Sequence, residues 1–270
     1  MKNLNVIQQV ENDLVKVEII ETDRLSGATD GRIAEKLFYM EQAGIKLKNI
    51  RITLKGGAVK VESGALYFMK GHINVATKPA KGFLKNLGSN LLSGEKMFKP
   101  EYSGEGEIWL EPSFGHFKII ELDDDEIIVD KGMFYACENK MAVSAVSQKN
   151  ISSTLFGGEG FFQTKIKGSG IVILSIPVPL EEVMVYQLNN EVLKVDGNFA
   201  LLRRGNIDFK VQMVSKGIIG TLASGEGLMQ TFSGSGEVWL APTQSIYEKL
   251  SSFSGMNAIP DDGTSNTETE

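Results

Sequence analysis

Short runs of apolar residues separated by glycines set the pattern along most of this chain. In runs such as 59–61 (Val-Lys-Val) and 209–211 (Phe-Lys-Val), β-branched or aromatic residues alternate with polar ones, as in half-buried strands. Two segments have helical spacing instead, 30–42 before Gly44 and the leucine-rich 82–92. The pattern predicts an all-β protein with one or two short helices.

A Gly-x-Gly motif recurs three times along the chain. Its second glycines, Gly106, Gly170 and Gly236, lie about 65 residues apart. The two tryptophans of the sequence, Trp109 and Trp239, each follow such a glycine by three residues. A fixed period of this length is typical of an internal structural repeat, and we interpret each Gly-x-Gly as a turn between two strands.

A second set of glycines recurs with the same period. Gly64, Gly132 and Gly197 each follow a valine and an acidic residue, and each opens an apolar segment. We predict a turn between two strands at each of these glycines. Two independent landmarks with one period indicate three diverged copies of one β unit.

The copies predict the organisation of the whole chain as a single domain over residues 1–250. A Gly-rich β unit of this size cannot bury its apolar face alone, so we expect the copies to pack around a shared core with a pseudo-three-fold axis. The final residues are polar and predict a disordered tail. The expected parts are an extension at 1–49, copies at about 50–115, 116–181 and 182–250, and the tail at 251–270.

Composition narrows the classes of function. The single cysteine, Cys137, excludes an internal disulfide, and its strand-like neighbours predict a small buried hydrophobic residue. No signal peptide and no apolar run long enough to span a bilayer are evident, so we expect a cytoplasmic protein without a transmembrane segment. The net charge of −6 argues against nucleic-acid binding, because phosphate contacts need clustered lysines and arginines.

Three recurring glutamates are the candidate metal ligands. Glu95, Glu159 and Glu226 each precede a Gly-x-Gly motif by about ten residues. Symmetry would bring three carboxylates together at an axis and create a metal or cation site. The alternative is that each glutamate occupies the same turn of its own copy, separated from the others by the core. Neither cofactors nor catalytic residues are predicted from the remaining motifs.

A run of acidic residues at 123–126 (Asp-Asp-Asp-Glu) is the other charged feature. Its carboxylates are suitable oxygen ligands for calcium, but the alternating spacing of a calcium-binding loop is missing. The run lies between two strand-like segments, which favours a hairpin turn.

Several motifs together resemble the mitochondrial-biogenesis AIM family. They are a Val-x-Val-Glu-x-Gly-Ala segment from Val59 to Ala65, the Ser-Gly-Glu segments at 93–95 and 224–226, the Gly-x-Gly-x-x-Trp-Leu motif, and Asp-Lys-Gly from Asp130 to Gly132. The resemblance covers about residues 50–245 and includes bacterial members described as a domain of unknown function.

The resemblance implies a fold like that of the tryptophan-RNA-binding attenuation protein. This fold consists of β-sandwich units of the double-stranded β-helix type, repeated about a pseudo-three-fold axis. The family offers no accepted catalytic residues, and its fungal members act in mitochondrial membrane organisation. A fold of this kind does not by itself fix a function.

Two functions remain open at this point. The first is a non-enzymatic scaffold or interaction module that binds protein partners or associates with itself, with peripheral membrane contact left open. The alternative is a small-ligand or metal-binding protein with a site at the repeat axis or inside one β unit. A hydrolase or isomerase cavity rests only on what similar folds contain.

Overall fold

The computed structural model describes residues 3–76, 99–147, 162–213 and 228–253 of the chain. Within these residues, twelve strands join into one network in which every pairing is antiparallel. The prediction of an all-β protein with one or two helices is confirmed. The elements are β1 (Leu4–Glu11), β2 (Val15–Thr22), α1 (Gly31–Gln42), β3 (Lys48–Val61), β4 (Leu66–Ala76), β5 (Glu101–Leu110), β6 (His116–Val129), β7 (Phe134–Glu138), β8 (Ala142–Ser147), β9 (Phe162–Ile176), the 3-10 turn η4 (Leu180–Glu182), β10 (Met184–Asp196), β11 (Ala200–Met213), β12 (Leu228–Leu240) and α3 (Gln244–Phe253).

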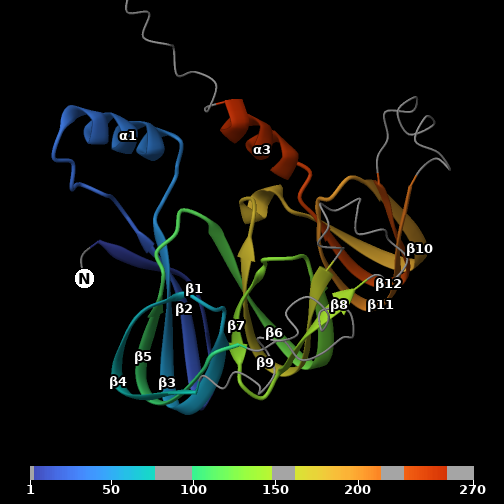
Figure 1. Ribbon diagram of the computed structural model, residues 1–270, viewed down its shortest axis with the longest axis horizontal. Coiled ribbons are helices and arrows are strands. Elements are labelled where there is room, and N and C mark those ends of the chain that lie inside the picture. The colour runs from blue at the N-terminus through green and yellow to red at the C-terminus, as the bar shows by residue number, and fades with distance from the viewer. Residues whose placement is uncertain (1–2, 77–98, 148–161, 214–227, 254–270) are drawn as a thin grey trace, which may run out of the picture.

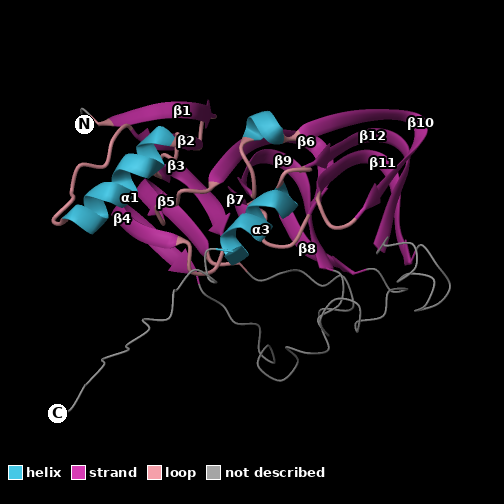
Figure 2. Cartoon of the chain, turned by 90° about the horizontal axis from the view of Figure 1, so that it is seen from above, coloured by secondary structure: helices cyan, strands magenta, loops and turns pink. Residues whose placement is uncertain are grey.

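The strands form three groups that follow one another along the long axis of the molecule (Figures 1 and 2). The first group contains β1–β5, the second β6–β9 and the third β10–β12. The main path through the network runs β1-β2-β3-β7-β9-β6-β11-β12-β10, while β5 joins β3 to β4 and β8 pairs with β9. Strands β4 and β10 therefore lie at opposite ends, as both views show.

Within the described residues, three hydrophobic cores fill the interior, and neighbouring strand groups share the first two of them. The first core includes Ile50 and Ile52 of β3 but also Ile119 of β6 and Ala136 of β7. The second core likewise combines residues of β6–β9 with Leu202 of β11. Among the residues that the structure describes, the third core draws its buried residues from the third group alone. Burial across these boundaries holds the first group to the second and the second group to the third, because removing apolar surface from water is the main favourable term in folding.

The glycines predicted to open an apolar segment do lie in turns between strands. Gly64, Gly132 and Gly197 have φ angles of +84°, +85° and +92°, which residues other than glycine rarely adopt. These turns connect β3 to β4, β6 to β7 and β10 to β11. The prediction of turns is confirmed at these positions.

The Gly-x-Gly motifs do not form turns, and that prediction is wrong. Each motif lies inside a continuous strand, β5, β9 or β12. In β5, a Cβ atom on Gly104 would lie 2.1 Å from the backbone oxygen of His72 in β4, at a φ of +127°. Glycine is needed here because two paired strands approach each other too closely for any side chain.

The acidic run around Asp124 is also not a hairpin turn. Strand β6 continues through it, with a bulge between Leu122 and Asp125 where Asp124 takes a φ of +44°. The backbone N–H of Asp124 donates to Ser169 Oγ at 2.8 Å, in the middle of the Gly-x-Gly of β9. In the third group, Asn190 forms the corresponding bulge and donates to Ser235 Oγ at 2.9 Å. The acidic residues 123–126 thus lie at and beside a bulge, where the strand pairing is locally interrupted and Asp123 and Asp124 are exposed to solvent.

One of the two predicted helices is confirmed. Helix α1 begins after Asp30, whose Oδ1 accepts hydrogen bonds from the backbone N–H groups of Arg32 and Ile33 at 2.8 and 3.0 Å. The second predicted helix, 82–92, and most of the predicted tail lie outside the described residues. Helix α3 was not predicted, and it extends three residues beyond the expected domain boundary at residue 250.

Replacing Gly104 by alanine is expected to destabilise the fold by about 2 kcal/mol or more, because the new Cβ meets a backbone oxygen and the φ is unfavourable. Urea unfolding monitored by far-UV circular dichroism measures the change. Gly27→Ala is the matched control, since nothing lies within 4 Å of its Cβ position and its φ is not positive. Equal stability of the two variants would contradict the close-approach explanation.

Candidate functional site

The three glutamates proposed as metal ligands, Glu95, Glu159 and Glu226, lie outside the described residues. Their convergence at an axis therefore stays a prediction. Within the described ranges, no group of three or more His, Cys, Asp or Glu side chains is arranged to hold a metal ion. In the same part of the chain, the helices are too short or too polar to cross a bilayer.

The acidic residues before the three turn glycines have three different environments. Glu62 accepts a hydrogen bond from the buried ammonium of Lys99. Asp130 is largely buried, and this burial raises its pKa to about 6 despite a hydrogen bond from the backbone of Lys131. Asp196 is exposed to solvent. The acidic residue that recurs before each turn glycine therefore does not form the same chemical site three times. Of the three, Asp130 has a raised pKa.

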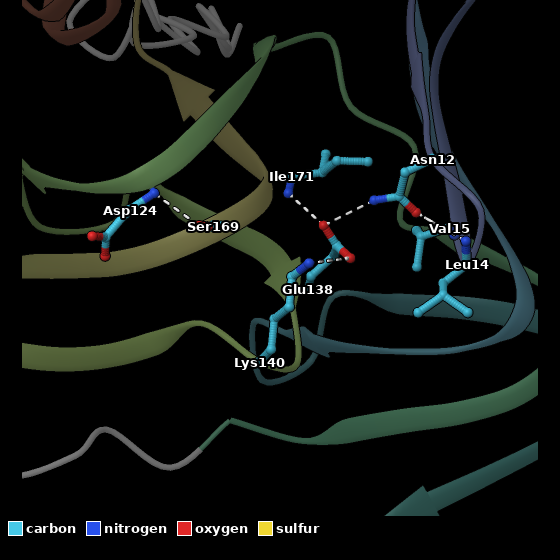
Figure 3. A network of polar contacts seen from close by, with 8 residues as sticks. All are labelled: Asn12, Leu14, Val15, Asp124, Glu138, Lys140, Ser169 and Ile171. Carbon is cyan, nitrogen blue, oxygen red and sulfur yellow. Dashed lines mark hydrogen bonds and ion pairs between the residues drawn. The ribbon is translucent and has the colours of Figure 1, made fainter.

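A buried carboxylate, Glu138 of β7, connects the N-terminal hairpin to the second group. Figure 3 shows its Oε2 accepting hydrogen bonds from Asn12 Nδ2 at 3.1 Å and from the backbone N–H of Ile171 at 2.8 Å. Its Oε1 lies 3.7 Å from the ammonium of Lys140. A Cβ on Gly170 would lie 2.5 Å from Oε2, so this glycine leaves the space that the carboxylate occupies.

The same network fixes the turn between β1 and β2. Asn12 Oδ1 accepts from the backbone N–H groups of Leu14 and Val15 at 3.0 and 2.9 Å, while its amide donates to Glu138 (Figure 3). A buried carboxylate needs such donors because desolvation otherwise penalises its charge. The network thus holds the β1–β2 turn, β7 and β9 in place relative to one another, so its role is structural.

Cys137 is buried in β7, as predicted. Burial raises the pKa of its thiol to about 12, so the thiol stays protonated at neutral pH. Because the thiolate is the nucleophile, this cysteine acts as a small core residue.

Arg203 of β11 is a buried cation that sequence reasoning missed. Burial lowers its pKa to about 10, which still leaves the guanidinium charged at neutral pH. Its Nη1 donates to Gln163 Oε1 of β9, and its guanidinium lies 4.5 Å from the ring centroid of Phe209. The hydrogen bond to Gln163 connects the third group to the second, while the contact with Phe209 lies within β11. The only signal in the sequence was a charged residue directly after an apolar pair, which is common on surfaces.

The two tryptophans make the same local contact. Each indole Nε1 donates to the glutamate two residues earlier, Glu107 at 3.3 Å and Glu237 at 2.6 Å. Trp109 is also stacked against Phe68 of β4, with ring centroids 5.5 Å apart. These tryptophans are structural landmarks, and Trp109 lies directly beneath an exposed apolar strand.

Strands β4 and β10 carry exposed apolar side chains on strand edges. Each is paired on one side only within the described residues. Tyr67 and Phe68 of β4 are 55% and 46% exposed, and Met184 and Val192 of β10 are 50% and 62% exposed. Unpaired backbone groups next to exposed apolar side chains form a template for pairing with another chain.

The two helices lie on one side of the strand groups (Figure 1) and also expose apolar residues. In α1 no side chain is buried, and Phe38 and Tyr39 are open to solvent. Helix α3 exposes Ile246 and Leu250, while Tyr247 donates to Glu182 Oε1 at 2.6 Å and so ties the helix to the 3-10 turn.

Removing the Glu138 carboxylate is expected to weaken the fold. Glu138→Ala leaves the N–H of Ile171 without its acceptor and should cost about 2–4 kcal/mol, whereas Glu138→Gln keeps an acceptor oxygen and should cost about 1 kcal/mol. Denaturant unfolding measures both, with Glu121→Ala on the exposed face of β6 as control. A loss for Glu138→Ala no larger than the control would contradict the role of this network.

Asp130 is expected to make stability depend on pH. Its pKa is raised from 3.8 to about 6 in the folded protein, so its contribution is fully present below pH 4 and is lost as the pH rises through 6. Relative to Asp130→Asn, the wild type should lose about 1–2 kcal/mol between these limits, measured by urea unfolding. Asp196→Asn, at the exposed corresponding position, should keep the wild-type profile. Parallel profiles for wild type and Asp130→Asn would refute the assignment.

Comparisons with known proteins agree with this architecture. The chain is 24% identical over 234 residues to the uncharacterized protein M6_Spy0233 of Streptococcus pyogenes serotype M6, which covers 83% of this chain and 91% of that protein. The crystal structure of protein SPYM3_0169 from Streptococcus pyogenes is similar, with a TM-score of 0.58 and 20% identity over 77% of this chain and 94% of the other. The structural likeness shows a shared fold.

A family profile described as mitochondrial biogenesis AIM24 matches residues 40–243. The match includes strands β3 to β12 and most of the described residues, and it confirms the resemblance noted from the motifs. The chain belongs to the mitochondrial biogenesis AIM24 family.

Proposed function

We propose that this chain is a non-enzymatic scaffold or interaction module that acts through its sheet edges. The observation that carries the proposal is the exposure of apolar side chains on β4 and β10, each paired on one side only within the described residues. Edge strands of stable proteins usually carry charges, prolines or a covering segment that block pairing. Here Tyr67, Phe68 and Met69 stand together on one edge, and Met184, Val185 and Tyr186 on the other.

The proposal includes three copies of one β-sandwich unit, at about 50–115, 116–181 and 182–250. Corresponding pairings support it: Gly106 lies opposite Leu54 of β3, Gly170 opposite Leu122 of β6, and Gly236 opposite Leu188 of β10. A closed arrangement of the three copies about a pseudo-three-fold axis would bring β4 next to β10 within one chain. These two strands lie at opposite ends of the molecule (Figure 2). The pseudo-three-fold axis is therefore kept only as a prediction.

The partners we expect are proteins, including further copies of this chain. The net charge of −6 disfavours nucleic acid as a partner. A reducing compartment such as the cytoplasm suits a chain whose one cysteine is a buried thiol. The exposed apolar residues of α1 and α3 leave peripheral membrane contact as a further prediction.

Site-specific photo-crosslinking in living cells tests the proposal. A photoreactive residue at Tyr67 or Val192 should give discrete products of higher mass that contain a second protein, because these side chains lie on the proposed edges. The same residue at Asp23, an exposed loop position, is the control. Products that are equally abundant at Asp23, or absent at both edges, would overturn the interaction-module proposal.

A further inference from the structure

A small cleft lies on the outer face of the first strand group, away from its hydrophobic core. The strands of this group are ordered β1-β2-β3-β5-β4, because β5 pairs with both β3 and β4. Their core-facing residues alternate with residues that point outward, as in any strand. The cleft has a volume of about 200 Å³. Its lining comes from four of the five strands and consists of Leu4, Val6, Ile20, Arg51 and Trp109.

A β-bulge in β1 turns one wall of the cleft toward the outer face. Gln8 lies opposite Ile19, which points into the core, whereas Val6 lies opposite Ile20. One residue of β1 is therefore extra between the two pairs. Gln8 faces inward, because its side-chain amide exchanges two hydrogen bonds with the backbone of Ile119 in β6, at 3.0 and 3.1 Å. Without the extra residue Val6 would share that inward face, so the bulge is what places Val6 in the cleft.

The apolar part of the cleft is formed before any ligand arrives. Ile20 is only 2% exposed and Trp109 only 8%, although both point away from the core. The indole of Trp109 is held by stacking against Phe68, and its Nε1 donates to Glu107 at 3.3 Å. A wall that is already fixed costs little ordering when a ligand binds against it.

Arg51 brings a positive charge to the cleft. Its Nε donates to Glu18 Oε2 at 2.7 Å, and its Cζ lies 5.5 Å from the ring centroid of Trp109. Glu18 is also 2.9 Å from the ammonium of Lys16, so two cations share this one buried carboxylate. The two Nη groups of Arg51 have no hydrogen-bond acceptor among the described residues. The guanidinium fork therefore keeps donors that match a further carboxylate.

The other two strand groups lack a cation at the matching position. Arg51 lies opposite Trp109, the residue three positions after a Gly-x-Gly motif. Ile119 of β6 and Val185 of β10 have the same place opposite Ile173 and Trp239. The repeated β unit thus folds with an apolar residue here. Arg51 is a departure from the repeat, and it occurs in the group where the β1–β2 hairpin adds a further wall.

We propose that this cleft binds a small carboxylic acid with a short alkyl chain. The carboxylate accepts hydrogen bonds from the Nη groups of Arg51, while the chain lies against Val6, Ile20 and Trp109. A volume of about 200 Å³ has room for roughly seven water-sized groups, since one water fills about 30 Å³ of liquid. Hexanoate has about this size. The proposal goes beyond the interaction module, because a ligand here occupies a face of the sheet and not its edges.

Titration with hexanoate, followed by proton–nitrogen correlation NMR, tests the proposal. The chain has two tryptophans, and Trp109→Phe assigns their two indole N–H signals. The Trp109 signal should shift saturably, with a dissociation constant of about 1 mM. Trp239 is an internal control, because its indole also donates to the glutamate two residues earlier but has no arginine opposite it. Equal shifts of both signals, or no saturable shift of Trp109, would overturn the proposal.

Acetate and hexanol separate the two parts of the site. Acetate lacks the alkyl chain and hexanol lacks the charge, so each should bind at least about tenfold more weakly than hexanoate. Hexanol that binds as tightly as hexanoate would show that Arg51 takes no part, and it would overturn the assignment of a carboxylic acid. Acetate that binds as tightly would overturn the role of the apolar wall.

Two neighbouring substitutions locate the site. Val6→Glu places a carboxylate in the cleft and should weaken hexanoate binding by about tenfold or more, because like charges repel. Ile7→Glu is the matched control and should leave binding unchanged, since Ile7 is 51% exposed but is not among the lining residues. Circular dichroism confirms that both variants are folded. Equal affinities of the two variants for hexanoate would overturn the proposed location.

Discussion

The sharing of hydrophobic cores between successive strand groups is the constraint on which the rest of this structure depends. A group of three to five strands buries one face of its sheet only if something covers that face. In the first two groups the covering residues come from the next group along the chain, as with Ile119 and Leu202. The groups are consequently held in a fixed order and at a fixed spacing, and no group can be moved without opening its neighbour's interior.

Polar contacts at the boundaries add direction to this apolar packing. Glu138 holds the N-terminal turn against β7 and β9, and Arg203 holds β11 against β9. Both are buried charges, which cost free energy unless every neighbour is placed correctly. They therefore favour one arrangement of the groups over nearby alternatives with similar apolar burial. The glycines beside them serve the same end, since Gly170 leaves room for the Glu138 carboxylate.

The sequence predicted the content of strands, the turn glycines and helix α1, because each of these depends on local residue preferences. It could not predict that the Gly-x-Gly motifs lie inside strands. A positive φ is equally suited to a turn and to a close approach between paired strands, and only the partner strand distinguishes them. The Asp124 bulge was missed for the same reason, since its hydrogen bond to Ser169 joins residues far apart in sequence. The burial of Arg203 depends on Gln163, forty residues away, and no local pattern reveals it.

The uneven cores have a consequence for how the molecule opens. Local stability in an array of packed units depends on the contacts that each unit makes with its neighbours. The middle group has a neighbour on both sides, whereas the third group, as far as the described residues go, has one neighbour and the smallest core. Transient opening should therefore begin in β10–β12 and spread toward the first group. Amide hydrogens of this group would exchange with solvent soonest, so that the chain carries a gradient of protection from one end to the other.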